Sequence, residues 1–231
     1  MEKTLVVSNH NSDLEWLTTT HDYGFSPENT IIYDRSDEVK DWSHLGESIR
    51  SPNVGENIYD IMRYIVEHYD NLPDICVFIK GNMFQRPEER GGAEYYTTRE
   101  RFYRALTAEY FLPIERFHDS TAFVCNGGGF IQPTWEAVTN PTVYTRHFST
   151  FPQMLSKLFV TPPNFPYNRF APGGNYVVPR ANILKFSKEF YEKLQFYVSY
   201  EPPEEFQSTS GESYLIERLL YMMWTEDLQE C

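Results

Sequence analysis

The feature that most constrains the fold is the apolar run at residues 75–79, with the sequence ICVFI. The run contains no polar residue, and turn-forming residues stand on both sides of it, with Pro73 before and Gly81 after. A short, wholly apolar segment between turn residues is typical of a central strand covered on both faces of a parallel sheet. We therefore expect residues 75–79 to lie in the middle of an α/β sheet.

Strands and helices alternate around this run. Short apolar segments at residues 4–8 and 30–33 predict two further strands, and residues 58–69 have the apolar spacing of an amphipathic helix. The later segments predict a helix at 97–111, a strand at 121–125, a short helix at 153–159, and two closing helices at 180–198 and 211–224. This alternation favours an α/β fold with a twisted, mainly parallel central sheet that is flanked by helices.

We expect a single domain over residues 1–231, because no convincing linker divides the chain. A chain of this length can bury a core of its own. Residues 132–172 are rich in Pro, Asn, Thr and aromatic residues and carry one credible short helix. This region is expected to form an irregular wall or lid.

The charge balance argues against nucleic acid as a partner. The chain has 20 Lys and Arg residues against 33 Asp and Glu residues, a net charge of −13, so it lacks the positive field that gathers polyanions. No apolar run approaches the roughly 20 residues of a transmembrane segment. Cys76, Cys125 and Cys231 are too few for a disulfide framework, and no usable glycosylation sequon is present. A cytoplasmic location is expected.

Polar clusters follow the predicted strands, and an open parallel sheet binds its ligands beyond the carboxyl ends of its strands. The clusters occupy residues 8–11, 34–36, 80–82 and 126–129. The candidate contacts within them include Ser8, Asn9, His10, Asp34, Lys80, Gly81 and Asn82. Each cluster alone is more typical of an ordinary loop, because Asn, Asp and Gly are common turn residues. Their shared place after strands is what favours a ligand site.

Two later features leave alternatives open. Gly173 and Gly174 predict either a tight turn or a backbone that approaches a ligand closely. Aromatic residues in loop-like regions, such as Trp135, could stack on sugar rings, although covering the sheet is the more common role for any one of them.

The start of the last helix carries carboxylates with two possible roles. Thr209 and Glu212 have the spacing of a capping box, with Thr209 as N-cap. The Glu212 carboxylate could instead act as a general base toward a hydroxyl, if burial raised its pKa. Glu217 and Arg218 lie further along the same helix, where an ion pair or a surface contact is the expected role.

Short motifs spread over nearly the whole chain resemble a known family. They are VVSNHNSDLEWL at 6–17, IYD at 32–34, NVGE at 53–56, DNLPD at 70–74, VFIKG at 77–81, APGG at 171–174 and ERL at 217–219. Their order resembles a family, formerly catalogued as a domain of unknown function in fungi, bacteria and some large viruses, that is grouped with GT-A-fold glycosyltransferases.

The resemblance implies a GT-A-like domain that moves a sugar from a UDP- or GDP-linked donor to a hydroxyl of a glycan acceptor. Residues 1–130 would bind the nucleotide sugar, and residues 131–231 would bind the acceptor and carry out catalysis. By their place in the family pattern, the donor contacts would be Ser8, Asn9, His10, Asp34, Asn53, Gly55, Lys80, Gly81 and Asn82. The acceptor contacts would be Trp135, Gly173, Gly174 and Asn175. Glu212 would deprotonate the acceptor in an inverting displacement.

The chain departs from the family pattern at the metal site. GT-A enzymes bind Mn²⁺ or Mg²⁺ through an Asp-x-Asp motif after a central strand, whereas residues 80–82 here are Lys-Gly-Asn and no Asp-x-Asp occurs in the chain. We hypothesise that Lys80 partly replaces the metal, and a divalent cation held by dispersed carboxylates stays open. No redox cofactor is expected.

Two other classes of function remain. A non-catalytic nucleotide- or carbohydrate-binding protein with a degenerate GT-A site is the alternative, and the missing Asp-x-Asp motif is its best support. An unrelated α/β hydrolase ranks low, because the chain has no Gly-x-Ser-x-Gly elbow.

Overall fold

The computed structural model describes residues 1–84, 97–115, 122–123, 144–148, 150–163, 168–169, 171–206 and 210–231. Its main sheet has six strands in the order β3-β2-β1-β4-β8-β5. The strands are β1 (Lys3–Asn9), β2 (Thr30–Asp34), β3 (Glu47–Arg50), β4 (Ile75–Lys80), β5 (Leu112–Pro113) and β8 (Tyr176–Pro179). The predicted α/β architecture is confirmed, and the run at residues 75–79 forms β4 between β1 and β8.

The sheet is mixed rather than parallel throughout. β3, β2, β1 and β4 are parallel neighbours. The strands expected at 4–8, 30–33 and 75–79 are β1, β2 and β4, whereas β3 was not predicted. β8 runs antiparallel to β4, and β5 runs antiparallel to β8. The segment before β8 therefore reaches the same edge of the sheet as the segments that follow β1, β2 and β4.

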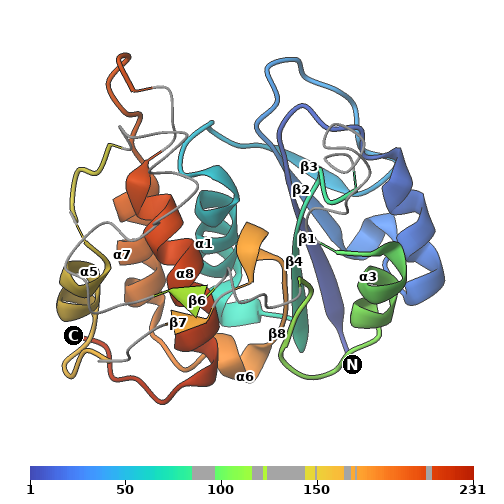
Figure 1. The fold of residues 1–231 in the computed structure, drawn as a ribbon. Coiled ribbons are helices and arrows are strands. Elements are labelled where there is room, and N and C mark those ends of the chain that lie inside the picture. Colours follow the sequence, from blue (N-terminus) through green and yellow to red (C-terminus); the bar gives the residue numbers. More distant parts are fainter. Residues whose placement is uncertain are drawn as a thin grey trace.

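Helices cover both faces of the sheet (Figure 1). One face carries α1 (Glu56–His68), α7 (Lys188–Val198) and α8 (Gly211–Thr225), and the other carries the 3-10 helix η1 (Glu15–Tyr23) and α3 (Arg99–Leu106). Side chains alternate between the two faces along a strand. Cys76 and Phe78 accordingly pack with α1 and α8, whereas Val77 packs with η1 and α3.

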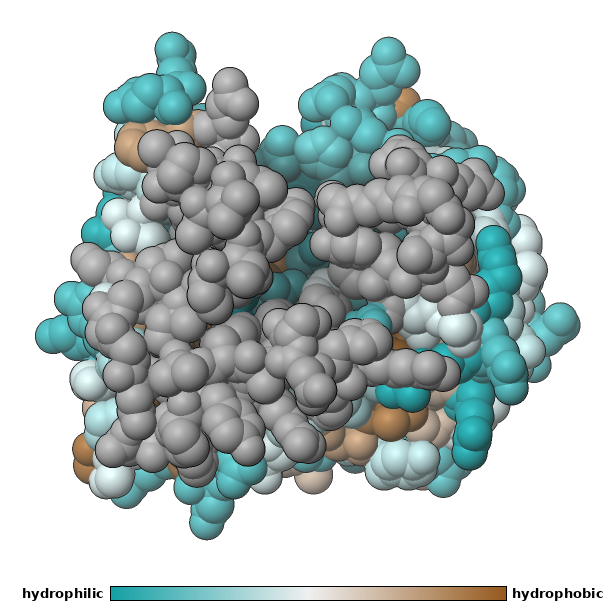
Figure 2. Space-filling model, viewed as in Figure 1, coloured by the Kyte–Doolittle hydropathy of each residue, from teal (hydrophilic) through white to brown (hydrophobic). Residues whose placement is uncertain are grey.

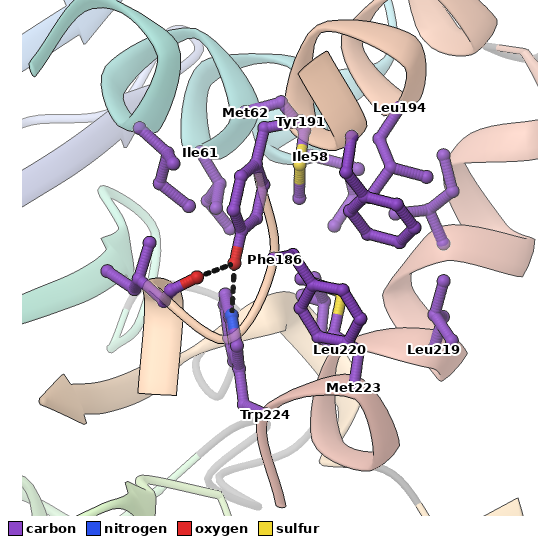
Figure 3. Packing of buried hydrophobic residues seen from close by; sticks show 14 of the residues in the cluster. Ile58, Ile61, Met62, Phe186, Tyr191, Leu194, Leu219, Leu220, Met223 and Trp224 are labelled. Carbon is purple, nitrogen blue, oxygen red and sulfur yellow. Dashed lines mark hydrogen bonds between the residues drawn. The ribbon is translucent and has the colours of Figure 1, made fainter. Parts of the chain in front are cut away.

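The core under α1, α7 and α8 is the larger of the two. Figure 3 shows side chains from all three helices meeting there, with the Tyr191 ring between them. The Tyr191 hydroxyl donates to the Ile183 carbonyl oxygen at 2.8 Å and lies 3.3 Å from the Trp224 Nε1. A buried hydroxyl costs free energy unless it is hydrogen-bonded, so these contacts make the ring compatible with a dry core.

Several predicted elements differ in extent from those observed. The helix expected at 180–198 is two helices, α6 (Arg180–Ile183) and α7, because the Ser187 side chain caps a new helix by accepting from the Phe190 N–H. The strand expected at 121–125 is described only as β6 (Ala122–Phe123), which pairs with β7 (Asn168–Arg169) in a separate two-stranded sheet and not in the main one. The remaining elements are α5 (Phe151–Leu158) and the 3-10 helices η2 (Pro27–Asn29), η3 (Tyr69–Asn71) and η5 (Pro172–Gly174).

None of the helices formed by the described residues combines the length and the apolar character that crossing a membrane requires.

Candidate functional site

Successive strands are added to one side of β1 first and then to its other side, so the sheet has a topological switch point between β1 and β4. From β1 the chain continues to β2 and β3 on one side, and then returns to place β4 on the other side of β1. Such a switch point, at the carboxyl ends of the strands, is where open α/β sheets bind their ligands. Ser8 and Lys80 face each other in register there, and Asn9 is paired in register with Asp34. The sequence prediction that these strand ends converge is confirmed.

This edge lies toward the top of the view in Figure 1, because β1 runs upward from the N-terminus and α1 begins there. Figure 2 shows a notch in the surface on this side, between the two upper parts of the molecule, and the coloured atoms within it are hydrophilic. The strand ends and this notch thus lie on the same side of the molecule.

The side chains at the ends of β1 and β2 bind mainly to one another. Asn9 Nδ2 donates to Asp34 Oδ1 at 3.2 Å, and the Ser36 hydroxyl donates to the same oxygen at 2.5 Å. Asn9 and Asp34 are both buried. Asn9 and Asp34 therefore fix the shape of these turns.

A buried carboxylate that the sequence analysis did not select lies beneath this edge. Asp60 in α1 accepts hydrogen bonds from the Ser8 and Ser51 hydroxyls and lies 3.1 Å from Arg35 Nε. Ser8, Arg35 and Ser51 follow or end three different strands, so Asp60 joins β1, β2 and β3 to α1. The available signal was an acidic residue among the apolar positions of an amphipathic helix.

His10 lies beyond this buried layer and is exposed. Partial burial and the nearby Arg35 guanidinium lower its pKa, while the Asp37, Glu56 and Asp34 carboxylates oppose that shift. A lowered pKa favours the neutral imidazole at physiological pH. His10 can therefore donate or accept a hydrogen bond at the rim without adding charge.

The start of α1 has an unusual backbone. Gly55 and Glu56 have φ angles of +57° and +52°, the left-handed region that residues other than glycine seldom adopt. A Cβ at Gly55 would lie 2.7 Å from the Val198 carbonyl oxygen, so packing against α7 also requires glycine there. Asn53, two residues earlier, is exposed. Left-handed residues often cluster at functional sites, and these two bring Glu56 to the edge where β4 ends.

Lys80 lies between two carboxylates. Its Nζ is 3.5 Å from Glu56 Oε2, and its charge acts on Glu217 in α8. Burial raises the pKa of Glu217, the Lys80 and Arg218 cations oppose that shift, and the Glu56 carboxylate adds to it. Of the two roles expected for Glu217 and Arg218, an ion pair or a surface contact, the structure has the ion pair, with 3.5 Å between Oε2 and Nη1. The position of Glu217 in the site was not predicted.

The glycine pair before β8 connects these groups. The Gly173 N–H donates to Glu217 Oε1 at 2.7 Å, and the Gly173 carbonyl oxygen accepts from Asn57 Nδ2 at 2.8 Å. A Cβ at Gly174 would lie 2.7 Å from the same Asn57 nitrogen. Gly174 is thus required by its close approach to α1, and Gly173 by its φ of +89°. The Gly173 N–H holds the Glu217 carboxylate at the site.

Two predicted residues tie β4 to its neighbours. The Lys80 N–H donates to Asn175 Oδ1 at 2.9 Å, so buried Asn175 joins the ends of β4 and β8. A Cβ at Gly81 would lie 2.6 Å from Asn9 Oδ1, and the Gly81 carbonyl oxygen accepts from Trp16 Nε1 at 3.0 Å. Asn82, the next residue, is partly buried.

Glu212 has the contacts of a structural anchor. Its side chain is fully buried, and Oε1 accepts from the N–H groups of Arg146, His147 and Phe148 at 2.9, 2.5 and 3.2 Å. Oε2 accepts from the Tyr200 hydroxyl, and burial and this carboxylate raise the pKa of Tyr200. Four donors leave this carboxylate little capacity for a substrate proton, so its contacts do not favour the predicted role as base.

The predicted capping box at the start of α8 is wrong in its register. α8 begins at Gly211 with Ser210 as N-cap, and the Glu212 carboxylate is turned to residues 146–148. The Glu212 carboxylate thus accepts from N–H groups that are distant in the sequence, and not from the N-cap N–H that the capping box implied. Thr209, Trp135 and the 126–129 cluster lie outside the described residues.

A family model covers almost the whole chain, matching residues 5–231. The chain belongs to the family of proteins of unknown function DUF3431. No curated protein and no solved structure matches it. The description of DUF3431 names no activity.

The described side chains at the site do not form a ligand set for a divalent cation. The residues that follow β4 are a lysine, a glycine and an asparagine, and the nearby Glu217 already accepts from Gly173 and pairs with Arg218. Within the described parts of the chain, no three His, Cys, Asp or Glu side chains gather as ligands could. Hard cations prefer several oxygen ligands, and these side chains do not supply such a set.

Proposed function

We propose that this DUF3431 protein is a glycosyltransferase that takes a sugar from a UDP- or GDP-linked donor and transfers it to a hydroxyl of a glycan acceptor. The observation that carries the proposal is the meeting, at a switch point of the sheet, of Ser8, Lys80 and the glycine pair with a carboxylate, Glu217. Crevices at switch points suit nucleotide ligands, and a carboxylate beside them suits proton transfer.

The rim around β1 and β2 supports a nucleoside subsite. His10 is exposed and favours its neutral form, so it can bond to or lie against a base without repelling it. The turn beneath it is held by the Asn9–Asp34 bond and by Asp60, which fixes the rim before a ligand arrives. A preformed subsite binds more tightly, because less ordering accompanies binding.

The diphosphate of the donor belongs beside Lys80 in this proposal. Lys80 Nζ lies 3.5 Å from Glu56 Oε2, and the Glu56 side chain is one-third exposed. A diphosphate carries more charge than one carboxylate and can compete with Glu56 for the ammonium group. Donor binding would then draw Lys80 toward the leaving group, where its charge stabilises the departing phosphate.

A binding protein without turnover is the second candidate function. The observation that favours it is the Lys80–Glu56 pair itself, because a cation bound by the protein's own carboxylate is less available to a departing phosphate. The two candidates make the same prediction for donor binding and opposite predictions for product release.

Thermal denaturation with a panel of UDP- and GDP-linked sugars tests the proposal. A ligand that binds only the folded state raises the midpoint, so at least one sugar nucleotide should raise it and release free nucleoside diphosphate when glycan acceptors are added. Lys80→Met should reduce the shift, whereas Lys188→Met, at a lysine of α7 with 38% of its side chain exposed, should leave it unchanged. The proposal fails if no sugar nucleotide shifts the midpoint, and binding without product release would establish the second candidate.

A further inference from the structure

We propose that Glu217 is the catalytic residue that takes the proton from the acceptor hydroxyl, and that Lys80 and Glu56 are positioning residues that act on it from either side. The inference rests on the proposed function. It moves the role of base away from Glu212, and it adds two charged neighbours whose removal has opposite, measurable effects.

The Glu217 side chain is partly accessible, since it keeps 15% of its surface exposed. Among the described residues its carboxylate accepts one hydrogen bond, from the Gly173 N–H at 2.7 Å, and its Oε2 lies 3.5 Å from Arg218 Nη1. A carboxylate with one such bond keeps lone pairs for a further donor, because each oxygen can accept two hydrogen bonds. An acceptor hydroxyl can therefore donate to Glu217.

Glu217 lies close enough to Lys80 for the two charges to interact. Gly173, which holds Glu217, belongs to the glycine pair before β8, and Asn175 of the same segment is bonded to the Lys80 N–H. The group that would take the proton thus lies beside the cation that would meet the leaving phosphate, as a displacement at one carbon atom requires.

Charged groups of both signs surround the Glu217 carboxyl. The charged groups that act on Glu217 come from three elements, Lys80 of β4, Glu56 of α1 and Arg218 of α8, and the buried Tyr176 of β8 lies among them. Burial raises the pKa of the carboxyl, and the two cations limit the shift. A base works best when its pKa lies near the operating pH, so this balance favours proton transfer.

The chemical step is a single displacement. The acceptor hydroxyl gives its proton to the Glu217 carboxylate while its oxygen forms a bond to the anomeric carbon of the donor sugar. The bond from that carbon to the diphosphate oxygen breaks, and its electron pair leaves with the nucleoside diphosphate. The anomeric configuration is inverted, and the protonated Glu217 later releases its proton to solvent.

The decisive variant is Glu217→Gln, compared with Glu192→Gln at an exposed glutamate of α7. Glu217→Gln should bind the donor within about twofold of the wild type and lower kcat by about 10²–10⁴-fold, the usual contribution of general base catalysis. Glu217→Asp, which keeps a carboxylate, should recover part of the loss, and circular dichroism checks that each variant is folded. Wild-type turnover in folded Glu217→Gln would overturn the assignment.

The pH dependence of kcat separates catalysis from structural support. Glu56→Gln removes a neighbouring negative charge and should move the acid limb to lower pH, whereas Lys80→Met removes a positive charge and should move it to higher pH. A merely structural role for Glu217 predicts no such opposite shifts, so unchanged limbs overturn the inference. If no sugar nucleotide binds the wild type, the proposed function fails; if the donor binds and Glu217→Gln still turns over, the inference fails alone.

Discussion

Helix α8 carries two carboxylates in very different surroundings. Glu212 is fully buried and accepts from three backbone N–H groups and the Tyr200 hydroxyl. Glu217, about 7.5 Å further along the helix axis, accepts from the Gly173 N–H, pairs with Arg218 and stays partly exposed. In the proposal above, the number of donors that already satisfy a carboxylate, and not its burial alone, distinguishes the base from an anchor.

Asp60 belongs with Glu212 in this comparison. It is buried, accepts from two serine hydroxyls and forms an ion pair with Arg35, so its partners also come from within the protein. We expect substitution of the anchoring carboxylates Asp60 and Glu212 to lower stability, and substitution of Glu217 to lower turnover.

The largest effect on stability is expected for Asp60→Ala. The Arg35 side chain is only 7% exposed, and removing its partner leaves a buried charge without compensation. We expect the free energy of unfolding to fall by about 3–5 kcal/mol, measured by urea denaturation. A fall below about 1 kcal/mol would mean that Arg35 reaches water in the variant, and that Asp60 is not an anchor.

Glu212→Gln should have the next largest effect. The amide keeps one oxygen to accept from residues 146–148 but loses the charge that strengthens these bonds. Hydrogen bonds to charged groups contribute about 1.5–3 kcal/mol, and we expect a loss in that range by urea denaturation, with donor binding per folded molecule unchanged. Unchanged stability together with lost turnover would restore Glu212 as the candidate base.

Gly174→Ala tests the glycine support of Glu217. Its φ is +66°, and the new Cβ would lie 2.7 Å from Asn57 Nδ2, whereas Gly24 has a φ of +89° with nothing within 4 Å. Both alanines carry the left-handed penalty of about 1–2 kcal/mol, and Gly174→Ala should lose more because the Asn57–Gly173 bond is also disturbed. Equal losses in the two variants would show that this approach of α1 tolerates a methyl group.

The smallest effect should have the opposite sign. The folded-state pKa of Glu217 lies above its ordinary 4.5, so the folded protein holds this proton more strongly than the unfolded chain, and ionisation destabilises the fold as pH rises past 4.5. Glu217→Gln removes that cost and should raise the thermal midpoint at about pH 7, with the gain vanishing as pH falls below 4.5. A lower midpoint at neutral pH would place Glu217 with the anchors.

The sequence predicts the parts of this molecule that rest on local patterns. The strands at residues 4–8, 30–33 and 75–79 are short apolar runs between turn residues, and their parallel arrangement brings Ser8 beside Lys80. The direction of β8 could not be predicted, because a short apolar run has the same appearance in either orientation.

The parts that the sequence did not predict depend on distant partners. Asp60 is bonded to Ser8, 52 residues away, and Glu217 to Gly173, 44 residues away. Contacts between residues so far apart leave no periodic pattern in the sequence. For Glu212 a local pattern, the capping box, was present, but the carboxylate instead accepts from the distant N–H groups of residues 146–148.

The antiparallel course of β8 has a consequence for how such a protein can diversify. Lys80 and Asn175 are 95 residues apart, yet one hydrogen bond fastens them at the rim. The long stretch between them is thus closed at its base, and loop closure depends only weakly on length. Insertions or exchanges there would leave this bond intact, so the proposed acceptor contacts in that stretch could change while Lys80 stays in place.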